Sequence, residues 1–259
     1  MGTENKIQGY IYVTTEDEEL FIGAKVGDRI IKKDRKPPYL VVDHTLDRIV
    51  VNRWPGKLYR VEVLDQDSDI ERSINENLVE NIWYTRTYGV QILEELDPFT
   101  LFGENGHSVA VIADFASAIS LEQAKKLSTY SLDENRKIIS KLWKNWTALT
   151  DPEYANQDID WTDTIAEHPK GQDKVSPVGY ALSLIYLRGF RRARELEDDN
   201  AIQFDEDENV YLVEKWQNVV SHLINVALSY ETDGLLTDKE IKQLRQPVCD
   251  VMSMVCKDN

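Results

Sequence analysis

Residues 39–64 read YLVVDHTLDRIVVNRWPGKLYRVEVL, and this stretch carries the strongest structural signal in the chain. An apolar strand is expected over 39–42 and a short helical turn over 45–51, followed by a break at the Trp-Pro-Gly sequence. Apolar and polar residues then alternate over 57–64, as they do in a strand with one buried face. The face expected to meet a core consists of Tyr59, Val61 and Val63. A mixed sheet built around these two strands is the starting hypothesis for the fold.

Outward from this stretch, the first half of the sequence reads as strands and the second half as helices. Short apolar segments separated by glycine and proline turns continue to a last expected strand at 109–112. From Ser120 onward apolar residues recur at helical spacing, most clearly over 132–149. The sequence therefore predicts an α+β protein, with a mixed β-rich domain over residues 1–115 and an α-helical domain over residues 116–259.

The helical half contains several signals for where helices begin. In three places a Ser or Thr precedes a Gln or Glu by three positions, the pattern of a capping box. These pairs are Ser120 with Gln123, Ser131 with Glu134, and Thr237 with Glu240. Further helices are expected from Pro177, over 210–230, and over 239–255 with a break or bend at Pro247. The arginines that end the Pro177 helix are expected to pair with the acids after them.

The formal net charge of −16 and the isoelectric point of about 4.7 restrict the classes of partner. Direct binding to duplex nucleic acid depends largely on Lys and Arg neutralising phosphates, so we expect none. Three roles remain: an ordinary acidic protein, a protein that binds basic protein surfaces, and a mimic of nucleic acid.

The two cysteines, Cys249 and Cys256, lie seven positions apart near the C-terminus, on one expected helix. Side chains two turns apart on a helix are too distant for a disulfide, so both are predicted to be reduced thiols in a reducing compartment. The N-terminus has no basic segment followed by an apolar run, and no segment has the apolar length of a membrane span. A cytoplasmic location without membrane contact is therefore expected.

The most specific local pattern is the acidic stretch 229–240, SYETDGLLTDKE, between two expected helices. It resembles a degenerate EF-hand loop, with Gly234 at the sharp turn and Ser229 in the first ligand position, where Asp is usual. The resemblance implies calcium ligands at Glu231, Asp233 and Glu240. A similar Asp-Gly turn before a capped helix occurs in helical families resembling the tellurite-resistance TerB proteins, where the loop needs no metal. A helix-turn-helix without metal and a calcium site both stay open, and no other cofactor is expected.

The order of elements in residues 7–96 resembles the ADP-ribosyltransferase fold. Members of that group use an Arg or His on the first strand, a Ser or Thr on the second and a Glu on a later strand. Here Tyr12 stands near the first position, the second strand runs into Asp43-His44-Thr45, and Glu94 or Glu95 is the candidate third residue. The resemblance implies NAD binding by the N-terminal domain.

The sequence contains few other residue patterns typical of catalytic or metal sites. Asp43, His44 and Asp47 could form an acid–base group, provided that a substrate lies within reach. The four histidines have no metal-ligand spacing, and neither a phosphate-binding glycine loop nor a nucleophile elbow is present. No motif singles out a reaction. The sequence favours a cytoplasmic, non-enzymatic interaction or regulatory protein whose acidic surface engages a protein partner with a basic surface. An ADP-ribosyltransferase-like enzyme that uses NAD and an acidic nucleic-acid mimic are the alternatives.

Overall fold

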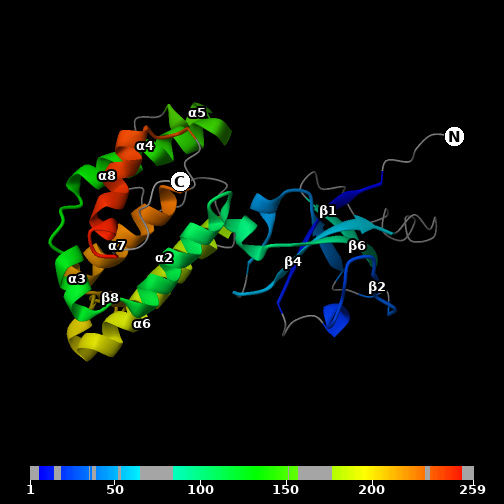
Figure 1. Cartoon of the computed structure of the whole chain (residues 1–259), viewed down its shortest axis with the longest axis horizontal. Coiled ribbons are helices and arrows are strands. Elements are labelled where there is room, and N and C mark those ends of the chain that lie inside the picture. Colours follow the sequence, from blue (N-terminus) through cyan, green and yellow to red (C-terminus); the bar gives the residue numbers. More distant parts are fainter. Residues whose placement is uncertain are drawn as a thin grey trace. The chain divides into compact units, whose positions relative to one another are not determined.

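The computed structural model describes residues 6–14, 19–34, 36, 39–51, 54–64, 84–150, 152–156, 177–230 and 234–252. The chain divides into two compact units. Unit 1 comprises residues 1–101 with 175–177, and unit 2 comprises residues 102–174 with 178–259. A six-stranded sheet forms unit 1, and helices dominate unit 2 (Figure 1). The predicted α+β class, β-rich first and helical second, is confirmed.

The sheet of unit 1 has the strand order β2-β6-β4-β1-β3-β5. Its strands are β1 (Gln8–Val13), β2 (Arg29–Ile31), β3 (Leu40–Asp43), β4 (Lys57–Val63), β5 (Tyr84–Thr87) and β6 (Gly89–Leu96). The expected strands at 39–42 and 57–64 are thus β3 and β4. A mixed sheet was expected, whereas all strand pairs between the described residues are antiparallel.

The core of unit 1 lies on the predicted face of β4. Tyr59 and Val61 are fully buried, and the partly buried Val63 packs against the same cluster. The short 3-10 helix η1 (Glu19–Phe21) contributes Phe21, whose ring stacks on Tyr59 with centroids 6.0 Å apart. A second 3-10 helix, η2 (Leu46–Arg48), forms the expected helical turn after β3, and η3 spans Pro98–Phe102.

The elements of unit 2 are α2 (Gly106–Ala118), α3 (Leu121–Leu127), α4 (Asp133–Thr150), α5 (Pro152–Ala155), α6 (Pro177–Glu197), η5 (Asp198–Ala201), β7 (Ile202–Phe204), β8 (Val210–Leu212), α7 (Glu214–Leu228) and α8 (Asp238–Cys249). Capping boxes begin α3 and α8 as predicted, at Ser120 and Thr237. At the start of α4, Ser131 Oγ instead accepts from the backbone N–H of Asp133. Pro247 lies inside α8, which continues to Cys249.

The apolar stripe predicted for 132–149 forms the core between α4, α7 and α8. Ile138, Ile139, Leu142 and Trp143 are buried there against Leu228, Leu236 and Leu244. Trp146 packs against this cluster and stacks on Trp143 with ring centroids 5.6 Å apart. Leu149 is the exception, because it is 70% exposed near the end of α4.

Two local predictions are wrong. The segment 109–112, expected to be a strand, lies in α2, where Val109, Ile112, Ala113 and Ala116 are buried at helical spacing. A short apolar run does not distinguish a strand from a buried helix. The domain boundary predicted after residue 115 stays a prediction, and that position lies within α2. Residues 210–212, expected to begin a helix, form β8 because they pair with β7.

The interpretation of Cys249 as a reduced thiol is wrong, because this residue is disulfide-bonded. The spacing argument assumed one continuous helix through both cysteines, whereas α8 ends at Cys249. The other cysteine of the sequence, Cys256, lies outside the described residues. No helix in the described segments combines the length and apolar character needed to cross a membrane.

Candidate interaction surface

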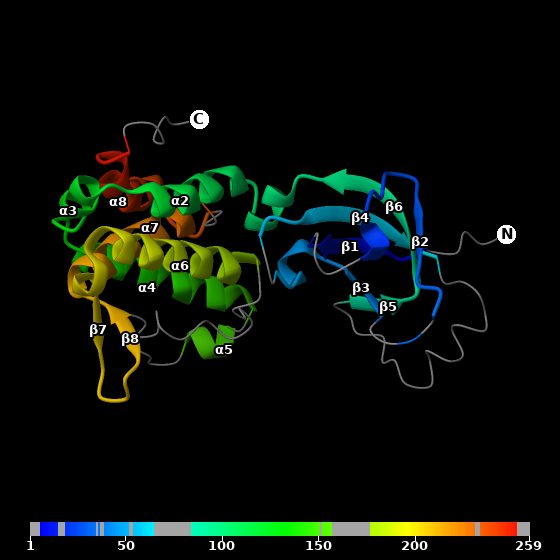
Figure 2. The ribbon, with the colours of Figure 1, turned by 90° about the horizontal axis from the view of Figure 1, so that it is seen from below.

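The β7–β8 hairpin is an exposed feature of unit 2. It projects from the end of α6, beyond the helices of that unit (Figure 2). The sequence DEDEN at 205–209 joins the two strands. Sequence reasoning placed acids here but missed the hairpin. The alternation of Ile202 with Phe204 and of Val210 with Leu212 on either side of the acidic turn was the signal that could have revealed it.

The turn is ordered by one of its own acids. The carboxylate of Asp205 accepts hydrogen bonds from the backbone N–H of Asp207 at 3.0 Å, and from the backbone N–H and side-chain amide of Asn209 at 2.8 and 3.0 Å. The hydrogen bond from the Asn209 side chain is the main cause that lowers the pKa of Asp205. Glu208 adopts a left-handed backbone conformation with φ of 61°. The turn therefore holds an ionised carboxylate in a defined loop.

The hairpin exposes apolar side chains beside these acids. Phe204 and Val210 are cross-strand partners, so they share one face, and they are 65% and 42% exposed. Tyr211, on the opposite face, is 42% exposed. Closer to the helices, Leu212 is fully buried. Only the outer part of the hairpin thus offers an apolar surface to a partner.

The acids at the hairpin tip differ from those nearer α6 in their ion pairs. The acids nearer α6 have partners, since Glu195 pairs with Arg192 at 2.9 Å and Asp199 with Arg194 at 3.7 Å. These two pairs confirm the expected pairing for Arg192 and Arg194, whereas Arg188 pairs with Asp114 of α2. In the described part of the chain, no ion pair involves any of the four acids at 205–208. An exposed Phe–Val pair therefore stands next to four carboxylates that form no ion pair with any described residue.

The base of the hairpin is fixed to the helices on both sides. Glu197, the last residue of α6, accepts from Lys215 Nζ at 2.7 Å and from the indole Nε1 of the buried Trp216 at 2.6 Å. The hydrogen bond from Lys215 is the main cause that lowers the pKa of Glu197. The backbone N–H of Val213 donates to the carbonyl of Ala201 at 3.0 Å. The hairpin thus has a defined direction relative to α6 and α7.

The predicted calcium ligands are only partly within the described residues, because Glu231 and Asp233 lie outside them. Glu240 is engaged in the capping box of α8 and in an ion pair with Lys141 at 2.7 Å. The hydrogen bond from Lys141, followed by those from Thr237, lowers the pKa of Glu240 to about 2.

At the first loop position, the guanidinium of Arg245 donates to both the hydroxyl and the carbonyl of Ser229. Gly234 has the positive φ of 77° expected for the sharp turn. The described residues contain no cluster of three or more His, Cys, Asp or Glu that could hold a metal. The calcium site stays a prediction, and titration calorimetry without heat at millimolar calcium would end it.

The residues that carry the ADP-ribosyltransferase resemblance do not form one group. The ring of Tyr12 stacks on Trp54 with centroids 6.3 Å apart. Glu94 pairs with Arg60 at 3.1 Å, and Glu95 pairs with Lys57 at 3.3 Å. Both glutamates are thus held by cations of the neighbouring strand β4.

The expected acid–base group is brought together in part. Asp43 and Asp47 are close enough for the charge of Asp47 to raise the pKa of Asp43, although burial is the larger cause, and the resulting pKa is about 7. His44 Nε2 lies 2.9 Å from Thr85 Oγ1 on β5, with which it shares a hydrogen bond.

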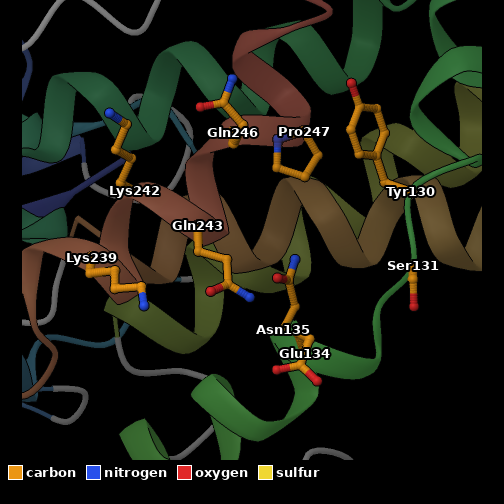
Figure 3. Close-up of a pocket in the computed structure, with 9 residues that line it drawn as sticks. All are labelled: Tyr130, Ser131, Glu134, Asn135, Lys239, Lys242, Gln243, Gln246 and Pro247. Atoms are coloured by element: carbon orange, nitrogen blue, oxygen red, sulfur yellow. The ribbon is translucent and has the colours of Figure 1, made fainter.

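A pocket of about 430 Å³ lies between α8 and the start of α4, lined among others by Asn135, Lys239 and Gln243 (Figure 3). Beneath it, the fully buried His222 donates from Nε2 to the carbonyl of Tyr130 at 3.2 Å, so its Nδ1 accepts from the amide of Asn135 at 3.5 Å. Burial lowers the pKa of His222 and keeps the ring neutral. This network joins α4 to α7. Sequence reasoning had treated His222 only as one of four scattered histidines.

Comparison of this chain with protein-family models, with curated proteins and with solved structures finds no match.

Proposed function

We propose that this protein is a non-enzymatic interaction protein whose acidic β7–β8 hairpin engages a basic surface of a protein partner. The supporting observation is the exposed pair of Phe204 and Val210 next to four carboxylates that have no ion partner among the described residues. Aromatic side chains at the centre of an interface supply most of the affinity, while surrounding charges steer association and select partners. A rigid hairpin also loses little conformational entropy on binding.

The proposal predicts a salt-dependent complex, because charges on exposed surfaces are screened over about 8 Å at physiological ionic strength. The full chain is immobilised and exposed to native lysate at low salt, and bound proteins are eluted by rising salt. A triple variant, Glu206→Gln, Asp207→Asn and Glu208→Gln, removes charge at the tip while Asp205 still orders the turn. We expect this variant, and Phe204→Ser, to lose the salt-eluted partner.

The matched control is the triple variant Glu122→Gln, Asp133→Asn and Glu134→Gln, which changes the net charge by the same amount on α3 and α4. It should retain the partner. Equal retention by the tip and control variants, or equal loss from both, would contradict a role for the hairpin. We expect the protein to meet its partner in the cytoplasm. Whether Cys249 is reduced or disulfide-bonded in cells tests this location, because cytosolic thiols are kept reduced.

The enzyme and nucleic-acid-mimic alternatives stay predictions. Glu94 is paired with Arg60, and Glu95 with Lys57. In an ADP-ribosyltransferase-like enzyme, one of these ion pairs would have to break before the glutamate could contact the substrate. Calorimetry of the full chain with NAD separates the alternatives, since heat at millimolar NAD would favour the enzyme over the interaction protein.

A further inference from the structure

A row of side chains crosses the sheet of unit 1 on the face opposite the core. The strand register places them next to each other on five adjacent strands. In order from β5 to β6 they are Tyr84, Asp43, Tyr10, Arg60 and Glu94. Side chains alternate between the two faces of a strand. Since Ile11 and Val42 belong to the buried core, their neighbours Tyr10 and Asp43 lie on the opposite face.

Of the two acids in this row, Glu94 pairs with a described cation and Asp43 does not. Arg60 donates to Glu94 at 3.1 Å, so these two charges compensate each other. Within the described residues, the carboxyl of Asp43 has neither a hydrogen bond nor an ion pair, although the residue is partly buried. Arg86, on the same strand as Tyr84, lies over the Tyr84 ring at 5.3 Å and donates to its hydroxyl at 3.2 Å. Asp43 is thus a carboxyl placed for a cation that the described residues do not supply.

The neighbours of Asp43 suit an organic cation. Tyr10 on β1 and Tyr84 on β5 are its direct register partners, and such partners have Cβ atoms about 5 Å apart. Tyrosine rings attract ammonium groups through the ring quadrupole and also pack against methyl or methylene groups. A carboxylate between two such rings combines charge with apolar contact. A metal ion would need more oxygen ligands than one carboxyl, and the described residues contain no group of three or more acids, histidines or cysteines that could hold one.

We propose that Asp43, Tyr10 and Tyr84 form a binding site for an alkylammonium group, either a lysine side chain or a small organic amine. This site lies in unit 1 and does not depend on the function proposed for the hairpin in unit 2.

The occupancy of this site should depend on pH. Burial and the neighbouring Asp47 raise the pKa of Asp43 to about 7, and a bound cation favours the ionised carboxylate. Affinity should therefore increase as the pH rises through about 7. The titratable groups around Asp43 are Asp47 of η2, Tyr10 of β1, Tyr84 of β5 and the adjacent His44. Because His44 is adjacent to Asp43 in the sequence, a His44→Gln variant separates any contribution of the imidazole from that of Asp43.

The test is an NMR titration of the full chain, in which the backbone amide signals of the five residues in the row report binding. The probes are N-acetyl-lysine methylamide, n-butylammonium and, as a neutral control, the same lysine derivative acetylated on Nζ. We expect millimolar affinity for the charged probes, as for a single exposed cation site, and none for the acetylated probe. Binding of both charged probes indicates a lysine side chain, whereas binding of butylammonium alone indicates a small amine.

Variants decide whether the three residues carry the binding. Asp43→Asn should weaken binding about tenfold or more, and Tyr10→Ala should weaken it as well, whereas Tyr10→Phe retains the ring and the affinity. Glu94→Gln, in the same row, is the matched control and should bind normally. The amide spectrum of each variant verifies folding. Equal binding of the acetylated probe, unchanged binding by Asp43→Asn, or no binding at millimolar concentration would overturn the proposal.

Discussion

The indole Nε1 of Trp216 donates a hydrogen bond of 2.6 Å to the carboxylate of Glu197. Glu197 ends α6 and Trp216 lies in the first turn of α7, so this contact helps to close the base of the β7–β8 hairpin, together with the hydrogen bonds of Lys215 and Val213. The direction of the hairpin therefore depends on a side-chain contact between two helices, in addition to its own strand pairing.

Glu197→Ala should destabilise unit 2 and loosen the hairpin. The substitution leaves the N–H of the buried Trp216 without a partner, at a cost of about 1–3 kcal/mol. Urea unfolding measures the loss, and hydrogen exchange of the β7 and β8 amides reports the loosening. In a Trp216→Phe background the same substitution should cost less, because no buried donor remains to be orphaned. Equal costs in both backgrounds would show that the hydrogen bond does not anchor the hairpin.

Asp43 should make the stability of unit 1 depend on pH. Its pKa is about 7 in the folded protein and near the ordinary value of 3.8 in the unfolded chain. The folded state binds the proton more tightly, so the free energy of unfolding decreases as the pH rises from about 4 to about 7. Asp43→Asn should therefore be more stable than the natural chain above pH 7 and similar to it below pH 4. Thermal unfolding across this range tests the expectation, with Glu94→Gln as the control that should not reproduce it.

The contribution of Glu240 to stability should change with pH in the direction opposite to that of Asp43. Its pKa of about 2 lies below the ordinary value of 4.5, so its contribution is present above pH 4.5 and is lost as the pH falls towards 2. In Glu240→Gln, the free energy of unfolding should fall less steeply as the pH decreases from about 4.5 to about 2. Thr237→Ala removes the N-cap hydroxyl and should cost about 1 kcal/mol at neutral pH. An unchanged slope over this pH range in Glu240→Gln would contradict this assignment.

Gly9→Ala should destabilise the pairing of β1 with β3. A Cβ atom at Gly9 would lie 2.4 Å from the carbonyl oxygen of Asp43 and 2.7 Å from Val42 Cγ1. Relief of this overlap requires the strands to separate, which costs about 1–3 kcal/mol. Gly23→Ala is the comparison, because Gly23 has a positive φ of 73° but open space around it. Its cost of about 1 kcal/mol should come from backbone strain alone. Chemical denaturation compares the two variants.

Cys249 should be protected from alkylation in the oxidised, purified protein and should become reactive after reduction. Mass spectrometry after alkylation, with and without reductant, measures this change. The same experiment on intact cells tests the cytoplasmic location, since cytosolic thiols are kept reduced. Alkylation of Cys249 in cells agrees with that location, whereas protection in cells would contradict it.

The sequence by itself determined what depends on short-range patterns. Alternation over 57–63 predicted both the strand β4 and its buried face, because side chains of a strand point to opposite sides at every step. The helical stripe of α4 and the capping boxes at Ser120 and Thr237 were equally readable, because their partners lie within one or two turns. The α+β class followed from the order of these patterns.

Only the three-dimensional structure decided what depends on which strands pair with each other. Residues 210–212 are apolar enough for a helix, but pairing with β7 makes them a strand. Asp43 meets Tyr10 and Tyr84 only through the register of three strands, and composition contains no information about register. The candidate site at Asp43 belongs to this second class, because strand pairing brings its carboxyl beside residues far apart in the sequence. The acids of the hairpin tip belong to the first class, since they are contiguous in the sequence.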